Sequence, residues 1–150
     1  MRPYCHQFLR EMSQYFELII FTASRQDYAD AVIKIIDPKN NIFSHRLYRQ
    51  HCRRYKGKSG TKEENVFVKD IRVLKNRKKE DLILIDNYIY SFAVDIENGL
   101  LIKPYYSGKD DNELEPMGRI LKNLKSFMDS PEFLTIHFKL DQFYDMLRKN

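Results

Sequence analysis

The stretch LIIFTAS, residues 18–24, places four apolar residues directly before a threonine, an alanine and a serine. A second stretch, LILIDN at residues 82–87, has the same form and ends on Asp86 and Asn87. Continuous apolar runs of this length are typical of strands that are covered on both faces, as in a parallel sheet. The sequence therefore predicts buried strands over 17–22 and 82–86, each followed by small polar or acidic side chains.

Helical patterns surround these two stretches. Apolar residues recur at helical spacing over 3–16 and 25–36, and the DPKNN segment at 37–41 ends the second helix. Strands separated by helices indicate an α/β fold with a parallel sheet, and we expect residues 1–150 to form a single domain. The remaining elements expected are strands over 42–48, 66–68 and 98–102, and helices over 71–76, 114–127 and 139–149.

The composition is that of a folded globular protein, with 43% hydrophobic and 31% charged residues. No apolar run approaches the roughly 20 residues that a membrane-spanning helix needs. The first 12 residues, MRPYCHQFLREM, lack the apolar core of a secretory signal. We therefore expect no membrane segment and a nuclear or cytoplasmic location.

The formal net charge of +5 is concentrated in residues 46–62, which hold seven Lys or Arg residues and no acidic residue. A run of this kind is usually a solvated loop, although it can also attract an acidic or phosphorylated partner. No nucleic-acid-binding motif accompanies it, so nucleic acid is not expected as a ligand. His45, His51 and Cys52 are candidate zinc ligands by residue type, but their spacing matches no common zinc pattern.

Chemistry-bearing side chains follow both predicted strands. In parallel sheets, ligands bind beyond the carboxyl ends of the strands, so Thr22 and Ser24 should meet Asp86 and Asn87 in one crevice. A hydroxyl group and a helix N-terminus could hold phosphate oxygens, Lys69 could neutralise their charge, and Asp86 and Asn87 offer oxygen ligands for Mg²⁺. Together these groups indicate phosphoryl transfer. Singly, each has a structural alternative: a helix cap, a turn and a surface lysine.

The ordered motifs RPYCHQFLREM, FELIIFTAS, YAD, HRLYRQHC, VKDI, LILIDN and NEL resemble the small C-terminal-domain phosphatases of the haloacid-dehalogenase superfamily. That family hydrolyses phosphoserine in proteins, so the resemblance implies a phosphorylated protein or peptide as partner and Mg²⁺ as cofactor. It implies that Thr22 binds the phosphoryl group and Lys69 stabilises it. It also implies that Asn87 ligates the metal and that Asp86 holds Lys69 or a metal-bound water. The substrate-binding residues it implies are Ala23, Ser24, Tyr28 and Arg46.

The family's D-x-D-x-T motif, whose first aspartate is the nucleophile and whose second is the general acid and base, is absent from this sequence. None of the 12 aspartates lies two positions from another. In the family the motif ends a central strand between the strands that end at Thr22 and Asp86. Without it, either the sheet closes differently, another segment fills the gap, or the chain is N-terminally truncated, which is the interpretation we favour.

Three functions remain open on these grounds. The first is a magnesium-dependent phosphoserine phosphatase whose nucleophile is missing from this chain. The second is a catalytically dead module that binds phosphopeptides or a partner protein. The third is a structural role, as in the phosphatase-like subunit of the mitochondrial inner-membrane translocase. Two local departures from the family affect the site: a longer segment after Cys52, and Tyr88–Ile89 in place of the usual Ser-Pro after the Asp-Asn pair.

Overall fold

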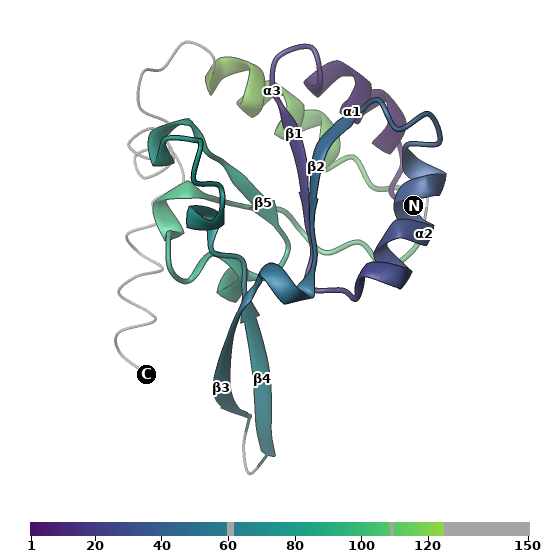
Figure 1. Cartoon of the computed structure of the whole chain (residues 1–150). Coiled ribbons are helices and arrows are strands. Elements are labelled where there is room, and N and C mark those ends of the chain that lie inside the picture. Colours follow the sequence, from purple (N-terminus) through teal and green to yellow (C-terminus); the bar gives the residue numbers. More distant parts are fainter. Residues whose placement is uncertain (60–61, 109, 125–150) are drawn as a thin grey trace.

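A parallel strand–helix–strand unit forms the first half of the computed structural model, which describes residues 1–59, 62–108 and 110–124 (Figure 1). Its elements are β1 (Leu18–Phe21), α2 (Gln26–Ile36) and β2 (Phe43–Leu47). The two strands pair in parallel and α2 makes the crossover. Ala29 and Ile33 of α2 pack with Tyr48, and with Ile20 of β1, in one apolar cluster. The predicted strand 17–22 and helix 25–36 are confirmed, with ends that differ by at most one residue.

Asp37 ends α2 and positions the start of β2. Its carboxylate is 2% exposed and accepts the backbone N–H groups of Asn41 and Ile42, each at 3.0 Å. Burial alone would raise the pKa of this carboxyl, but the N–H donors from the following loop outweigh burial and leave the pKa below its ordinary value. The helix break expected at 37–41 is thus a hydrogen-bonded turn that fixes where β2 begins.

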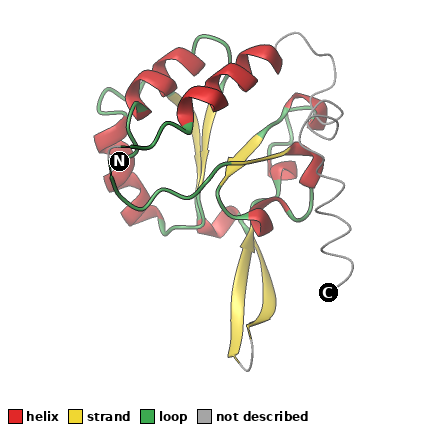
Figure 2. Ribbon diagram, turned by 180° about the vertical axis from the view of Figure 1, so that it is seen from behind, coloured by secondary structure: helices red, strands yellow, loops and turns green. Residues whose placement is uncertain are grey.

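The second half of the fold is a parallel strand pair covered by two helices (Figure 2). Its elements are β5 (Leu84–Asp86), β6 (Gly99–Leu101), α1 (Cys5–Met12) and α3 (Leu114–Leu124). Met12 of α1 and Leu121 of α3 share an apolar cluster with Leu18 of β1 and Ile85 of β5. The helix layer therefore contacts both strand pairs and holds them in one core.

Short 3₁₀ turns lie between the strands from β2 to β6. A second apolar cluster joins Ile71, Leu84, Phe92 and Ile96, and Phe92 is 1% exposed. The turns are η1 (Arg49–His51), η2 (Ile71–Val73), η3 (Lys79–Asp81), η4 (Ile89–Phe92) and η5 (Ile96–Asn98). The helix predicted over 71–76 is wrong: only η2 forms, because the Asp70 side chain accepts the backbone N–H of Arg72 and closes a tight turn.

The basic segment is a β-hairpin and not the solvated loop that its charge predicts. Strands β3 (Arg53–Ser59) and β4 (Lys62–Val68) pair antiparallel and extend away from the rest of the molecule (Figure 1). Tyr55 lies opposite Val66, and Arg54 opposite Phe67. Cross-strand pairs of this kind stabilise a sheet and explain why the segment is ordered despite its charge.

Strands β1 and β5 each pair on one edge only within the described part of the chain. β1 pairs with β2, and β5 pairs with β6, in separate two-stranded sheets. The sheet has therefore not closed by pairing β1 with β5, and no described segment lies hydrogen-bonded between them. Two other predicted elements differ in their bounds: the first helix is shorter than 3–16, and the strand at 98–102 is Gly99–Leu101. The helix predicted at 139–149 lies outside the described residues.

Candidate active site

A pocket of about 390 Å³ lies at the carboxyl ends of β1 and β5. Thr22 follows β1, and Asp86 is the last residue of β5. The carboxyl ends of the two parallel strand pairs therefore meet at this pocket. β4 of the hairpin supplies a further wall. The lining residues are Thr22, Ala23, Ser24, Asn65, Val66, Phe67, Lys69, Asp86, Asn87, Tyr88 and Ser91. The structure thus brings together six of the eight predicted site residues.

Thr22 forms a turn at the end of β1. Its backbone N–H donates to Leu47 O at 2.9 Å, which extends the β1–β2 ladder by one residue. Its Oγ1 accepts the backbone N–H of Ser24 at 3.1 Å. Helix α2 is preceded by Arg25 and not by Thr22, so Thr22 is not the helix cap considered as its structural alternative. A hydroxyl group that accepts one hydrogen bond still has its own proton to donate to a ligand in the pocket.

Lys69 and Asp86 form a buried ion pair inside the pocket. Their side chains are 12% and 7% exposed. The Lys69 Nζ donates to Asp86 Oδ2, and the Lys69 backbone N–H donates to Ser91 O at 2.7 Å. Asp86 Oδ1 accepts the Tyr88 N–H at 2.8 Å. Lys69 is therefore held at both ends, and it brings a positive charge to the pocket that contains the Thr22 hydroxyl.

The oxygen ligands in this pocket are too few for a Mg²⁺ site. Such sites usually use one or two carboxylates, with waters and substrate phosphates completing the octahedron. Among the side chains that the structure describes, Asp86 is the only carboxylate in the lining, and both of its oxygens are already used by Lys69 and Tyr88. Asn87 is exposed and adds a single amide oxygen. The described residues therefore do not fit a resident Mg²⁺ without a further carboxylate.

Arg49 lies beside the pocket, although no sequence pattern predicted a role for it. Its Nε donates to Ala23 O at 2.6 Å, its backbone N–H donates to Ser24 O at 3.0 Å, and its guanidinium lies 5.1 Å from the Phe67 ring centre. Arg46 instead pairs with Asp30 at 3.4 Å. Arg46 and Tyr28 are absent from the pocket lining, and their substrate roles stay predictions.

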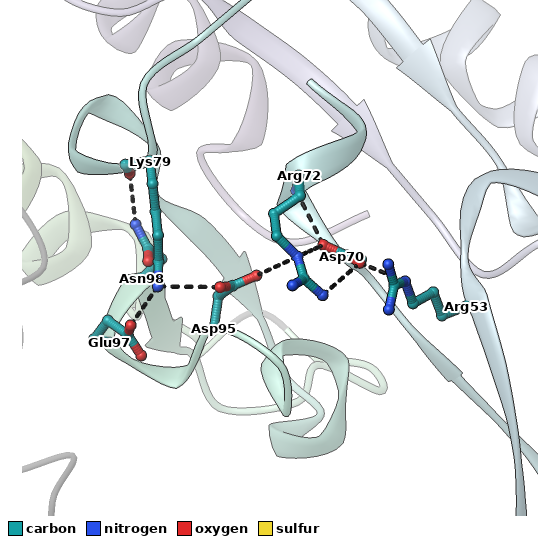
Figure 3. Close-up of polar contacts among 7 residues, drawn as sticks. All are labelled: Arg53, Asp70, Arg72, Lys79, Asp95, Glu97 and Asn98. Carbon is teal, nitrogen blue, oxygen red and sulfur yellow. Dashed lines mark hydrogen bonds and ion pairs between the residues drawn. The ribbon is translucent and has the colours of Figure 1, made fainter. Parts of the chain in front are cut away.

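The segment that carries Lys69 is braced by a charged network (Figure 3). Asp70, which is 4% exposed, accepts hydrogen bonds from Arg72 and pairs with Arg53 of β3 at 2.5 Å. The Arg72 guanidinium holds the pKa of this carboxyl below its usual value. Asp95 continues the network toward Lys79, at 3.1 Å. Because Arg53 begins β3, the brace fixes the base of the hairpin beside Lys69.

Cys52 and the two neighbouring histidines do not supply a metal site or a nucleophile. Among the residues placed by the structure, no three His, Cys, Asp or Glu side chains gather as metal ligands. The His51 Nδ1 already accepts the Tyr48 N–H at 2.9 Å. Burial raises the pKa of the Cys52 thiol, although the nearby Lys69 and Arg49 charges oppose the rise. The thiol therefore stays protonated near neutral pH and is a poor nucleophile.

Residues of the hairpin and of η4 were missed by sequence reasoning. Asn65, Val66 and Phe67 reach the pocket because β4 pairs with β3, a contact that no local pattern predicted. Tyr88 and Ser91 reach it because the chain turns immediately after Asp86. The sequence feature that could have identified these residues is that they lie near Lys69 or Asp86 along the chain.

Comparisons with known proteins find a matching family and several relatives. The model of the family described as NLI interacting factor-like phosphatase matches residues 1–131. The CTD small phosphatase-like protein 3 of Caenorhabditis elegans is 33% identical over 141 residues, which cover 93% of this chain and 46% of that protein. Nuclear envelope morphology protein 1 of Saccharomyces cerevisiae is 31% identical over 144 residues, which cover 89% of this chain and 29% of that protein. The chain spans less than half the length of these relatives.

Among solved structures, that of Fcp1, an essential RNA polymerase II CTD phosphatase, superposes with a TM-score of 0.65 at 22% identity. It matches 84% of this chain and 46% of that chain. Fission yeast Fcp1-R271A bound to beryllium fluoride matches 99% of this chain and 40% of that chain, with a TM-score of 0.54.

Parallel strands that end together at a threonine, a lysine and an Asp-Asn pair define an α/β protein with the haloacid-dehalogenase-like phosphatase fold. The chain belongs to the NLI interacting factor-like phosphatase family. Separately, none of the described helices combines the length and apolar character needed to span a bilayer.

Proposed function

We propose that this chain is a protein serine/threonine phosphatase domain that binds phosphoserine in the Thr22–Lys69 pocket but does not hydrolyse it alone. The observation that carries the proposal is the convergence of Thr22, Lys69 and the Asp86–Asn87 pair on one pocket. The Thr22 hydroxyl and nearby backbone N–H groups would donate to phosphoryl oxygens, and Lys69 would offset their charge. The substrate would be a phosphorylated protein or peptide, as the names of the related phosphatases suggest for those proteins.

The missing step is nucleophilic attack. By the family resemblance, a carboxylate attacks phosphorus, the P–O bond to serine breaks, and a second carboxylic acid protonates the leaving oxygen. The chain contains no D-x-D pair, and Asp86 is committed to Lys69. Asp86 therefore cannot replace the nucleophile without leaving Lys69 unpaired. Mg²⁺ dependence belongs to the complete site, because an added pair of carboxylates would supply the metal ligands lacking here.

A phosphopeptide-binding role follows from the same observation. Thr22, Lys69 and Asn87 line one pocket, which supports phosphate binding there, whereas the sequence contains no D-x-D pair to act as nucleophile. A nuclear or cytoplasmic location stays a prediction. For the function itself, phosphopeptide binding and phosphate release are the two measurements that separate a binding module from a hydrolase.

The test compares the chain with a variant that carries an added N-terminal apolar strand ending in D-x-D-x-T. Phosphate release from a phosphoserine peptide is measured with Mg²⁺. We expect no turnover by the chain itself, turnover by the extended variant, and loss of that turnover when Lys69→Ala is added. A matched Lys75→Ala change, at an exposed lysine outside the pocket, should leave turnover intact. Hydrolysis by the unextended chain, or an extended variant indifferent to Lys69→Ala, would contradict the proposal.

A further inference from the structure

One face of the β3–β4 hairpin is continuous with the pocket. Residues directly opposite each other in an antiparallel pair share a face, as do alternate residues along a strand. Arg54 lies opposite Phe67, and Lys56 opposite Asn65, so these four residues occupy one side of the hairpin. We call this side the basic face. Asn65 and Phe67 also line the pocket, so each of the two cations lies directly opposite a lining residue.

The cations of the basic face are exposed and available to a ligand. Among the side chains that the structure describes, neither Arg54 nor Lys56 contacts an acidic group. Arg53, the adjacent residue on the opposite side, is instead bound to Asp70 (Figure 3). The brace at Arg53 therefore orients the hairpin without using the Arg54 side chain.

Arg49 connects the basic face to the pocket. Its guanidinium lies over Phe67 at 5.1 Å and is tethered to Ala23 O. Arg49, Arg54 and Lys56 thus form a series of positive charges beside the pocket and along the hairpin. Along β3, Arg54 and Lys56 are two residues apart, or about 7 Å. An extended peptide has nearly the same rise, so acidic groups at alternate positions would match this spacing.

We propose that the basic face docks the acidic flank of the peptide whose phosphoserine enters the pocket. The partner it fits is an extended segment with carboxylates or further phosphates about two to four residues from the bound phosphoserine. This inference rests on the proposed function, since the pocket must hold the phosphoserine. Charge complementarity and the shared residues Asn65 and Phe67 favour an acidic peptide over an apolar one.

The experiment measures binding of labelled phosphoserine peptides by fluorescence anisotropy. One peptide carries glutamate two and four residues from the phosphoserine on both sides, and its match carries glutamine. Because two exposed ion pairs contribute modestly, we expect the acidic peptide to bind about fivefold more tightly at low salt. The preference should disappear in the Arg54→Gln/Lys56→Gln variant and at high ionic strength, where exposed charges are screened.

A matched double variant controls for net charge. Arg10→Gln/Lys34→Gln removes two exposed cations from α1 and α2, away from the hairpin, and should keep the fivefold preference. Arg54→Glu/Lys56→Glu should reverse it, so that a lysine-flanked phosphopeptide binds better. Equal binding of both peptides to the unmodified chain, or a preference unchanged in the Arg54→Gln/Lys56→Gln variant, would overturn the proposal.

Two further probes distinguish the docking surface from the phosphoserine pocket and from a nucleic-acid site. If the neutral phosphopeptide binds no better than its unphosphorylated form, the proposed function fails, whereas a lost acidic preference alone defeats only the docking surface. A single-stranded DNA 12-mer tests nucleic acid as the occupant. Displacement of the acidic phosphopeptide by an equal concentration of DNA, through Arg54 and Lys56, would overturn the choice of an acidic peptide.

Discussion

Under the proposed function, Thr22 uses a single hydroxyl group for two purposes. Its Oγ1 accepts the Ser24 N–H at 3.1 Å, which shapes the turn after β1. The hydroxyl proton remains for a phosphoryl oxygen in the pocket lined by Lys69. A charged acceptor makes such a hydrogen bond stronger than an ordinary one. The local turn and the binding of phosphate therefore depend on the same atom.

Two substitutions at Thr22 separate the contribution of the side chain's shape from that of its hydroxyl hydrogen bond. Thr22→Val keeps the branched shape but loses the hydroxyl, and should weaken phosphopeptide binding by about 1.5 kcal/mol, or roughly tenfold in Kd. Thr22→Ser keeps the hydroxyl and should bind within about twofold of the unmodified chain, which is well below the effect of a lost charged hydrogen bond. Calorimetric titration measures both. Equal losses in the two variants would assign the effect to packing of the methyl group and not to the hydroxyl.

The sequence predicted the residues at strand ends better than those at the rim. Thr22 and Asp86 follow apolar runs, and the geometry of parallel strands brings such ends together. Arg49 had no comparable signal, because its place depends on η1 and on the Phe67 ring of a hairpin whose charge predicted a loop. The family resemblance pointed to Arg46 in its place, and Arg46 lies against Asp30 on the α2 side.

At the scale of the elements, two buried glycines permit different kinds of contact. Gly99 begins β6, and a Cβ there would lie 2.5 Å from the Phe92 ring, which is 1% exposed. Gly118 lies inside α3, where the nearest atom to a Cβ would be in Phe8, at 3.7 Å. A Cβ at position 99 would overlap sterically with the Phe92 ring, which is enclosed by the core. The contact at position 118 is ordinary van der Waals contact.

Alanine at these two positions should therefore have opposite effects. Gly99→Ala should lower the free energy of unfolding by about 2–3 kcal/mol, because Phe92 and β6 must shift apart. Gly118→Ala should raise it by about 0.5–1 kcal/mol, since alanine favours the helix interior. Urea unfolding at neutral pH measures both changes. A neutral Gly99→Ala variant would mean that the Phe92 ring moves freely, contrary to its burial.

The Asp70 carboxyl makes the free energy of unfolding depend on pH. Hydrogen bonds from Arg72, with the nearby charges of Arg72 and Arg53, hold the Asp70 pKa below its ordinary value against the opposing effect of burial. A lowered pKa in the folded state contributes stability above the unfolded-state pKa, about 3.9 for aspartate, and this contribution is lost as pH falls through the folded-state value. Glu17, Asp30 and Asp37 have pKa values shifted in the same direction.

We therefore expect the free energy of unfolding to fall as pH drops below about 4. Asp70→Asn should lower stability at neutral pH and reduce the steepness of the acid decline, because asparagine does not titrate. Asp81→Asn, at an exposed aspartate of η3, removes the same charge outside the network and serves as the control. Urea midpoints from pH 2.5 to 7 provide the measurement. An identical slope in the Asp70→Asn variant and the unmodified chain would contradict the assignment.

At the scale of the whole molecule, two parallel strand pairs are joined mainly through helices. The cluster containing Met12 and Leu121 contacts Leu18 on one pair and Ile85 on the other. β1 and β5 nevertheless do not pair within the described ranges. The α/β class was predictable from strand and helix periods, which are local. The separation of the pairs was not predictable from these periods, because it depends on which backbone edges find a partner; the family resemblance indicated it through the missing central strand.

Adding a strand between β1 and β5 tests this arrangement independently of chemistry. Two N-terminal extensions are compared, one ending in D-x-D-x-T and one ending in N-x-N-x-T. Both should raise the free energy of unfolding by at least about 3 kcal/mol, because burying two apolar side chains alone contributes roughly that amount. In both, amide hydrogen exchange should slow at those alternate residues of 18–21 and 84–86 whose N–H groups face away from β2 and β6, and stay unchanged in the β3–β4 hairpin. Only the aspartate version should release phosphate. Stabilisation without protection of those outward-facing amides would place the added strand elsewhere, and β1 and β5 would then not be the two sides of its site.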